Sequence, residues 1–159
     1  MTRRKVLFLC TGNSCRSQMA EALTNARYGD RWEAYSAGTA PTGEVHPKAL
    51  QVLAEIGVHH QGRSKGLHEV RGMAFDLVIT VCDQARETCP AWLGPGVTIH
   101  RGFPDPAQAT GSEDEVLAAF RAVRDAIAAM LDEVLGAPPQ AKRAEGEEGF
   151  LLSKPPQAG

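Results

Sequence analysis

The sequence predicts an α/β fold: a single domain built on a four-stranded parallel sheet with helices on both faces. Short, continuous apolar runs at 5–10 and 75–82 are typical of strands buried on both sides, and they alternate with segments of helical periodicity. Such alternation favours parallel strands joined by helical crossovers. The length agrees, because 159 residues are enough for one core and too few for two substrate domains.

Two strand and helix pairs are expected in the first part of the chain. The apolar run at 5–10 predicts a central strand, and the helical spacing of apolar residues at 16–28 predicts the helix that follows it. Alternation at 32–38 predicts a second strand. A second helix is expected at 47–57, because a proline suits its first position and a glycine offers its end.

The second part of the chain adds two strands and a long closing helix. The run at 75–82 is rich in branched residues and ends, like the first strand, at a cysteine, while 97–101 predicts a shorter strand. Ser112 and Glu115 form a capping box, which opens an amphipathic helix that Gly136 ends.

Composition changes after the closing helix. Four of the ten prolines fall in residues 137–159, so we expect a disordered tail there and a folded domain at 1–136.

Charge and cysteine content exclude several classes of function. The net charge is −2, so no basic field exists to bind nucleic acid, and an anion must be held by local chemistry. Four cysteines are too few for a disulfide scaffold in a chain of this length. The start carries no export signal and no apolar stretch is long enough to span a membrane, so we expect a cytoplasmic protein that does not bind membranes.

The segment CTGNSCRS, from Cys10 to Ser17, carries the chemistry. A tight loop of small residues between a strand and a helix turns backbone N–H groups toward one point, where the helix N-terminus adds positive charge. Arg16 can donate two parallel hydrogen bonds to a tetrahedral anion, and Cys10 in the same field is a candidate nucleophile to which Ser17 donates. Gly12 is expected to permit the turn. The predicted oxyanion-binding residues are Thr11, Gly12, Asn13, Ser14, Cys15, Arg16 and Ser17.

A less specific interpretation is a core cysteine beside a surface arginine, which is the common case for either residue alone. The Walker and dinucleotide glycine motifs are absent. A zinc site is disfavoured because there is no CxxC pair and no ligand spacing among His59, His60 and His100. We therefore expect no metal site.

The CX5R motif followed by serine, directly after the first strand, resembles the low-molecular-weight protein tyrosine phosphatase superfamily. Within it, the string CTGNSCRSQMAE, the segment YSAGT at 35–39 and the pair Cys82 and Cys89 in VCDQARETCP resemble the thioredoxin-coupled arsenate reductases. The resemblance covers about residues 6–135. It implies a phosphatase-like domain with the flavodoxin-like strand order, reduction of arsenate to arsenite, and thioredoxin as the reductant.

The resemblance also implies a mechanism. Cys10 attacks arsenate, and Asp105 protonates the departing oxygen. Cys82 then attacks Cys10 to form a transient Cys10–Cys82 disulfide, and Cys89 resolves it to leave a Cys82–Cys89 disulfide for thioredoxin. If 82–89 were helical, the two sulfurs would lie about 10 Å apart, so the segment must unwind before they can bond.

The alternative from another reaction class is a phosphatase of phosphotyrosine or another phosphoester, which would share Cys10, Arg16 and Asp105. The flanking prolines hold Asp105 on an extended turn. In the phosphatases an aromatic residue follows this Asp-Pro, whereas here Ala107 follows, which favours a small inorganic anion. A third hypothesis is a non-enzymatic sensor of oxyanions or metals.

The remaining expectations concern residues around the loop and the binding partners. Cys15 is assigned no catalytic role, and Asn13, supported by Ser36, is expected to hold the loop's shape. Some relatives bind potassium through residues such as Glu21, but Arg63 and Lys65 fall where oxygen ligands would be wanted. A potassium site is therefore doubtful, Lys65 is a candidate for its place, and no tightly bound cofactor is expected. Arsenate is the expected ligand of a monomer, with phosphate or sulfate as competitors.

Overall fold

The computed structural model describes residues 3–83 and 91–136. Its elements are β1 (Arg4–Cys10), α1 (Arg16–Arg27), β2 (Trp32–Gly38), α2 (Pro47–Ala54), the 3₁₀ helix η1 (Leu67–Glu69), β3 (Leu77–Thr80), β4 (Val97–His100), the 3₁₀ helix η2 (Pro106–Gln108) and α3 (Glu113–Val134). The chain divides into two compact units, residues 1–128 and 129–159, and α3 runs from the first into the second.

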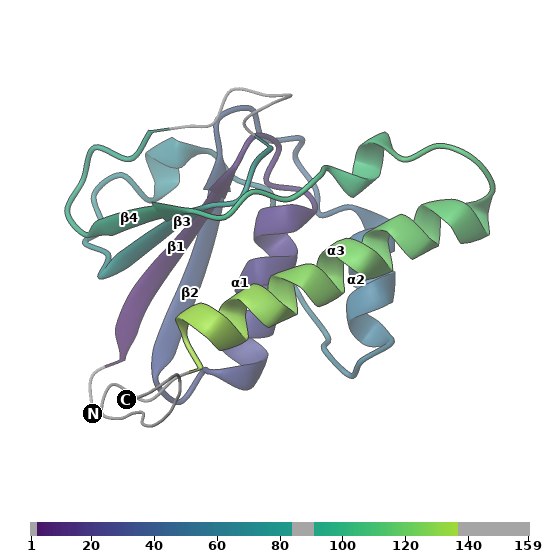
Figure 1. The fold of residues 1–159 in the computed structure, drawn as a ribbon. Helices are drawn as coiled ribbons and strands as arrows, with labels where there is room; N and C mark the ends of the chain where they lie inside the picture. The colour runs from purple at the N-terminus through teal and green to yellow at the C-terminus, as the bar shows by residue number, and fades with distance from the viewer. Residues whose placement is uncertain (1–2, 84–90, 137–159) are drawn as a thin grey trace, which may run out of the picture. The chain divides into compact units, whose positions relative to one another are not determined.

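The four strands form one parallel sheet in the order β2-β1-β3-β4 (Figure 1). This confirms the predicted fold class, including the flavodoxin-like order of its strands. In the register of β1 and β2, Cys10 lies opposite Gly38, and in that of β1 and β3, Leu9 lies opposite Thr80. The chain leaves β1 toward β2 on one side and returns to β3 on the other, so the order reverses at the carboxyl end of β1, where open α/β sheets bind ligands.

Helical segments lie on both faces of the sheet, as predicted, although in the described residues the second face is covered only by the short helix η1 and the loops beside it. On one face α1 packs against β1 and β2. On the other, Leu7 and Leu9 of β1 join a buried cluster with Val70 and Phe75 from the chain around η1, and Trp92 packs edge-on against Phe75. Because successive strand residues point to opposite faces, the continuous apolar run of β1 fills both cores.

The strand β3 is shorter than the predicted run of 75–82. Phe75 lies before the strand with its ring in the cluster just described, and the carboxylate of Asp76 accepts the Lys5 N–H at 2.8 Å. At its other end the pairing with β1 continues past the strand, since Val81 N–H donates to the Leu9 carbonyl at 2.8 Å. The apolar run in the sequence is therefore longer than the strand, because residues on both sides of β3 are also buried.

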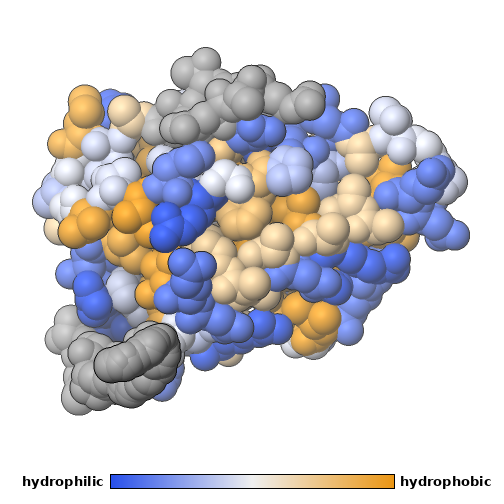
Figure 2. Space-filling model, in the orientation of Figure 1, coloured by the Kyte–Doolittle hydropathy of each residue, from blue (hydrophilic) through white to orange (hydrophobic). Residues whose placement is uncertain are grey.

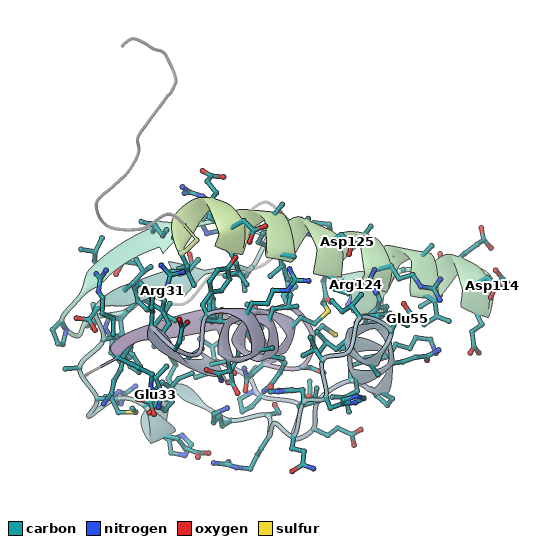
Figure 3. The ribbon with its side chains drawn as sticks, turned by 90° about the horizontal axis from the view of Figure 1, so that it is seen from below. Arg31, Glu33, Glu55, Asp114, Arg124 and Asp125 are labelled. Carbon is teal, nitrogen blue, oxygen red and sulfur yellow. The ribbon has the colours of Figure 1, made fainter. Side chains whose placement is uncertain are left out.

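An ion-pair cluster joins α2 to the part of α3 in the first unit. Arg121 makes paired hydrogen bonds to Glu55 at 2.7 and 2.9 Å, and Arg124 donates to the same carboxylate at 2.9 Å. Figure 3 shows Arg124 and Glu55 facing each other between these helices. Arg124 is 8% exposed and also donates to the Val52 carbonyl, so its charge is paired and its donors are used despite burial.

The predicted capping box opens α3. Ser112 N–H donates to the Glu115 carboxylate at 2.8 Å, and Glu115 N–H donates to the Ser112 hydroxyl at 3.1 Å. Alanines form much of the exposed side of this helix, which Figure 2 shows as a pale strip bordered by hydrophilic residues. Within residues 3–83 and 91–136, no helix combines the length and apolar character that crossing a membrane requires.

Candidate active site

The predicted anion loop lies at the carboxyl edge of the sheet. Cys10 is the last residue of β1, and α1 begins at Arg16 with Cys15 as its N-cap. Cys82 follows the neighbouring strand β3 by two residues, so the two cysteines leave adjacent parallel strands at the same edge. The N-terminus of a 12-residue helix is therefore aimed at the nucleophile, as the motif predicts.

The loop's carbonyl oxygens are bound from outside. Backbone donors reach three of them: Ala40 N–H donates to Thr11 O at 2.9 Å, Thr42 N–H to Gly12 O at 3.1 Å, and His46 N–H to Ser14 O at 3.0 Å. In a trans peptide the C=O and the following N–H point in opposite directions. Holding the carbonyls outward therefore turns the N–H groups of the next residues toward the enclosed side, which makes an anion cradle without a basic surface.

The sulfur of Cys10 lies at the centre of this cradle. It is 2.9 Å from the Ser17 hydroxyl oxygen and accepts the Asn13 N–H at 3.3 Å. Its residue is 1% exposed. Two hydrogen-bonding groups therefore lie against the sulfur, a geometry that suits a nucleophile.

The left-handed turn of the loop is made by Asn13 and not by Gly12. Asn13 has a φ of 49°, whereas Gly12 is outside the left-handed region. A Cβ on Gly12 would lie 3.3 Å from a methyl carbon of Thr42, so its small size serves close packing. The expectation for Gly12 is corrected: asparagine tolerates this conformation because its side chain can hydrogen-bond locally.

Asn13 is held by residues other than Ser36. Its side-chain oxygen accepts the Lys65 N–H at 2.8 Å and the Gln18 amide at 2.9 Å, and its amide donates to Ser17 at 2.8 Å. Ser36 instead donates to Glu21 at 2.6 Å. The expected support by Ser36 is therefore wrong, and the side chain of Gln18 takes that part.

Gly38 lets the loop lie over the end of β2. A Cβ there would overlap the Thr11 carbonyl oxygen and lie 3.0 Å from the backbone nitrogen of Asn13. Both obstacles are backbone atoms and cannot swing aside. The glycine of the YSAGT segment is thus needed for the backbone of the cradle.

Arg16 and Asp105 meet across the site. The guanidinium of Arg16, whose residue is 3% exposed, donates to the Phe103 carbonyl at 3.2 Å and lies 3.7 Å from the Asp105 carboxylate. Asp105 has an extended backbone, with ψ at 109°, and accepts the Ala107 N–H at 3.0 Å. Its side chain is 28% exposed, so it can exchange protons with water.

The cysteines differ in state. Cys10 and Cys15 are free thiols, whereas Cys82 is disulfide-bonded and fully buried. Cys89 lies outside the described residues. Burial, with the charge of Asp105 next in importance, raises the pKa of the Cys15 thiol to about 12. A thiol that stays protonated is a poor nucleophile. That Cys15 has no catalytic role stays a prediction.

A lysine and a carboxylate pair beside the loop. The ammonium of Lys65 lies 3.7 Å from Glu21, with both side chains 14% exposed, and donates to the Arg63 carbonyl at 3.1 Å. The ammonium therefore stands next to the oxygens that a cation would need.

Sequence reasoning missed four supporting residues: Gln18, His46, His60 and Ser64. Ser64 donates to the Gly12 carbonyl at 3.0 Å. The His46 ring caps α2 by accepting Lys48 N–H at 3.1 Å, and burial, aided by Lys48, lowers its pKa and keeps this nitrogen unprotonated. The histidine directly before the proline that opens α2 could have indicated an N-cap. No local sequence pattern indicates the contact of Ser64.

Comparison with known proteins agrees with this site. A family model described as low molecular weight phosphotyrosine protein phosphatase matches residues 5–144. An arsenate reductase of Halalkalibacterium halodurans is 43% identical over 128 residues, which cover 80% of this chain and 91% of the relative.

Solved structures agree as well. A crystal structure of arsenate reductase from Archaeoglobus fulgidus matches with a TM-score of 0.70 at 31% identity, covering 82% of this chain and 98% of that one. A thioredoxin-dependent arsenate reductase of Corynebacterium glutamicum matches with a TM-score of 0.57 at 28% identity, covering 83% of this chain and 62% of that one. The chain therefore belongs to the low molecular weight phosphotyrosine protein phosphatase family and, within it, to the branch that holds the arsenate reductases.

Proposed function

We propose that this chain reduces arsenate to arsenite, with Cys10 as the nucleophile and thioredoxin as the final reductant. The observation that carries the proposal is the anion cradle around the Cys10 sulfur, combined with a second redox-capable cysteine, Cys82, after the adjacent strand. A phosphatase needs only the first feature. Thiol chemistry of this kind requires a reducing compartment, so we place the activity in the cytoplasm.

In the first step the Cys10 thiolate attacks arsenic(V) held by the loop N–H groups and Arg16. A sulfur–arsenic bond forms and an arsenic–oxygen bond breaks. Asp105 gives the departing oxygen a proton, so that it leaves as water. The 3.7 Å approach of Asp105 to Arg16 supports this role, because it puts the acid beside the residue that holds the anion.

In the second step the Cys82 thiolate attacks the Cys10 sulfur. The new sulfur–sulfur bond leaves the electron pair of the sulfur–arsenic bond on arsenic, which departs as arsenite. Cys89 then attacks Cys82, which frees Cys10 and moves the disulfide to Cys82–Cys89. Two electrons from a thioredoxin dithiol reduce that disulfide, so the cycle balances one arsenate against two thiols.

The positive charge beside the loop comes, in this proposal, from Lys65 and not from potassium. The ammonium already pairs with Glu21, whose carboxylate also accepts from Ser36. No step of the reaction needs a metal ion in this scheme.

The test is arsenate-dependent oxidation of NADPH through thioredoxin and thioredoxin reductase, run beside hydrolysis of an aryl phosphate. Cys82→Ser and Cys89→Ser should each abolish multiple turnover with arsenate. Both should keep any phosphatase activity of the wild type, because that reaction uses only the cradle, Cys10 and Asp105. This retained activity is the internal control for folding.

Two outcomes would count against the proposal. If the Cys82→Ser variant still turns over arsenate, the proposed relay through Cys82 and Cys89 is wrong. A wild-type protein that hydrolyses aryl phosphate fast and ignores arsenate would establish the phosphatase alternative, for which the shared cradle is the supporting observation.

A further inference from the structure

The buried amide of Gln18 connects the anion loop to a histidine outside it. Gln18 is 0% exposed, and its nitrogen donates to three oxygens: Asn13 Oδ1 at 2.9 Å, Asn13 O at 3.2 Å and Arg63 O at 2.9 Å. All three are acceptors, so the amide cannot be reversed. Its carbonyl oxygen therefore faces away from the loop, where His60 Nε2 lies at 2.8 Å.

This contact assigns the His60 tautomer. A side-chain carbonyl oxygen only accepts hydrogen bonds, so His60 Nε2 must carry the proton in the neutral ring as well as in the charged one. Burial lowers the pKa of the His60 imidazole, and the positive charge of Lys65 lowers it further, whereas the negative charge of Glu21 acts in the opposite direction. The lowered pKa favours the neutral ring. The ring remains a donor to Gln18 in either state.

Gly62 leaves the space that the contact occupies. A Cβ at this position would overlap His60 Nε2 and lie 2.5 Å from the Gln18 carbonyl oxygen. Any larger residue would push the imidazole off the amide. The approach of His60 to Gln18 thus depends on a glycine that no turn conformation demands, since Gly62 is not among the residues of positive φ.

From Gln18 the hydrogen bonds run in one direction to the nucleophile. Lys65 N–H can only donate, which fixes the Asn13 side-chain oxygen and turns the Asn13 amide toward Ser17 at 2.8 Å. The Ser17 oxygen accepts there, so its own proton is available to Cys10 at 2.9 Å. Aligned donors of this kind polarise one another, so each strengthens the next.

We propose that His60 is a positioning residue for the Cys10 nucleophile, acting through the Gln18 amide and the Asn13 and Ser17 side chains. Its Nε2–H satisfies a carbonyl that would otherwise be buried without a donor, and so holds Gln18 against the loop. The inference rests on the proposed role of Cys10 and is independent of arsenate, the relay and thioredoxin.

The experiment follows alkylation of Cys10 by iodoacetamide as a function of pH, read by mass spectrometry of the Cys10 peptide in reduced protein. His60→Ala should slow the reaction at pH 7 by roughly three- to tenfold, the size expected for loss of one neutral hydrogen bond, and move its pH midpoint upward. His60→Gln keeps an amide donor and should react close to wild type. His60→Glu presents a carboxylate to the Gln18 carbonyl and should react slowest. Gly62→Ala should reproduce His60→Ala without altering either partner.

His59→Ala is the matched control, because His59 is exposed, adjacent in sequence and absent from these contacts. Equal rates in wild type and His60→Ala, or in the Gln and Glu variants, would overturn the proposal. If His60→Ala does not fold, as judged by circular dichroism, ¹⁵N NMR of wild-type imidazoles at pH 8 decides: an unprotonated His60 Nε2 overturns the inference, and a protonated one upholds it. Failure of the proposed function looks different: the wild type would then show no NADPH-linked turnover with arsenate, whereas the His60 variants would still differ from it in the rate of Cys10 alkylation.

Discussion

The hydroxyl oxygen of Ser17 lies 2.9 Å from the sulfur of Cys10, on the first turn of the helix that follows the anion loop. Ser17 is 0% exposed, so water does not compete for this contact. Its hydroxyl oxygen accepts from the Asn13 amide at 2.8 Å, which leaves its own proton available to the sulfur. One buried side chain is thus placed to donate a hydrogen bond to the nucleophile.

Ser17→Ala should reduce the rate of Cys10 alkylation and kcat/KM for arsenate together. Loss of a hydrogen bond to a charged group costs about 1.5–3 kcal/mol, which corresponds to roughly a 10- to 100-fold decrease. The control is Ser112→Ala, which should lower the free energy of unfolding by about 1 kcal/mol by removing a helix cap while leaving kcat/KM intact. A Ser17→Ala protein of normal reactivity would show that the contact does not stabilise the thiolate.

Cys15 should resist alkylation in the folded protein. Its pKa is raised from 9.0 to about 12, so the thiol stays protonated and unreactive at pH 8. The pKa of this thiol is higher in the folded protein than in the unfolded chain, so the unfolded chain loses the proton first as the pH rises. The contribution of Cys15 to the free energy of unfolding is therefore fully present below about pH 9 and is lost as the pH rises from there toward 12. Mass spectrometry after iodoacetamide treatment at pH 8, with and without urea, measures the difference. Equal labelling of Cys15 in both samples would contradict the prediction.

Gly38→Ala should damage the cradle, while Gly72→Ala should not. The new Cβ at 38 would overlap a backbone oxygen, whereas a Cβ at 72 has nothing within 4 Å. We expect Gly38→Ala to lose at least about 2 kcal/mol of unfolding free energy and most activity, and Gly72→Ala to stay within about 1 kcal/mol of wild type. Urea titration and the NADPH-linked assay check both. Similar behaviour of the two variants would mean that the loop shifts freely over β2.

Turnover should be the same in potassium and in sodium chloride at equal ionic strength. This prediction follows from the proposal that the Lys65 ammonium, 3.7 Å from Glu21, supplies the local charge in place of an alkali cation. Lys65→Met should lower kcat/KM, and Lys65→Arg should retain more of it because the charge is kept. Activation of the wild type by potassium alone would refute this account.

The chain's fold could be predicted because its signals are local. The apolar run of β1 and the reciprocal Ser112 and Glu115 bonds each depend on residues close in sequence, and the structure has both. For the same reason the motif could place Cys10 at the end of a strand and Arg16 and Ser17 at the start of the next helix, where the structure has them. The roles of these residues in binding and catalysis stay predictions. The role of Cys89 stays a prediction, because that residue lies outside the described part of the chain.

The contacts that shape the loop could not be predicted in this way. The Asn13 side chain accepts the backbone N–H of Lys65, which lies 52 positions later in the chain. Because almost every residue has a backbone N–H, the identity of the residue does not indicate such a contact. Ser36 was expected to support Asn13, but its hydroxyl donates instead to Glu21, whose carboxylate is a stronger acceptor. The contact between Gln18 and His60 forms only after helix α1 and residues 60–63 have packed against each other, so no local pattern predicts it.

The outward carbonyls of the loop have a consequence for what the eight-residue motif can do alone. Their donors come from Ala40, Thr42, His46 and Ser64, so the cradle exists only after about fifty residues beyond the motif have folded around it. A peptide or truncated chain carrying CTGNSCRS intact would lack these donors and therefore the cradle. If Cys10 is the nucleophile, as we propose, its reactivity is acquired with the tertiary structure and measures the fraction of molecules in which that structure is complete.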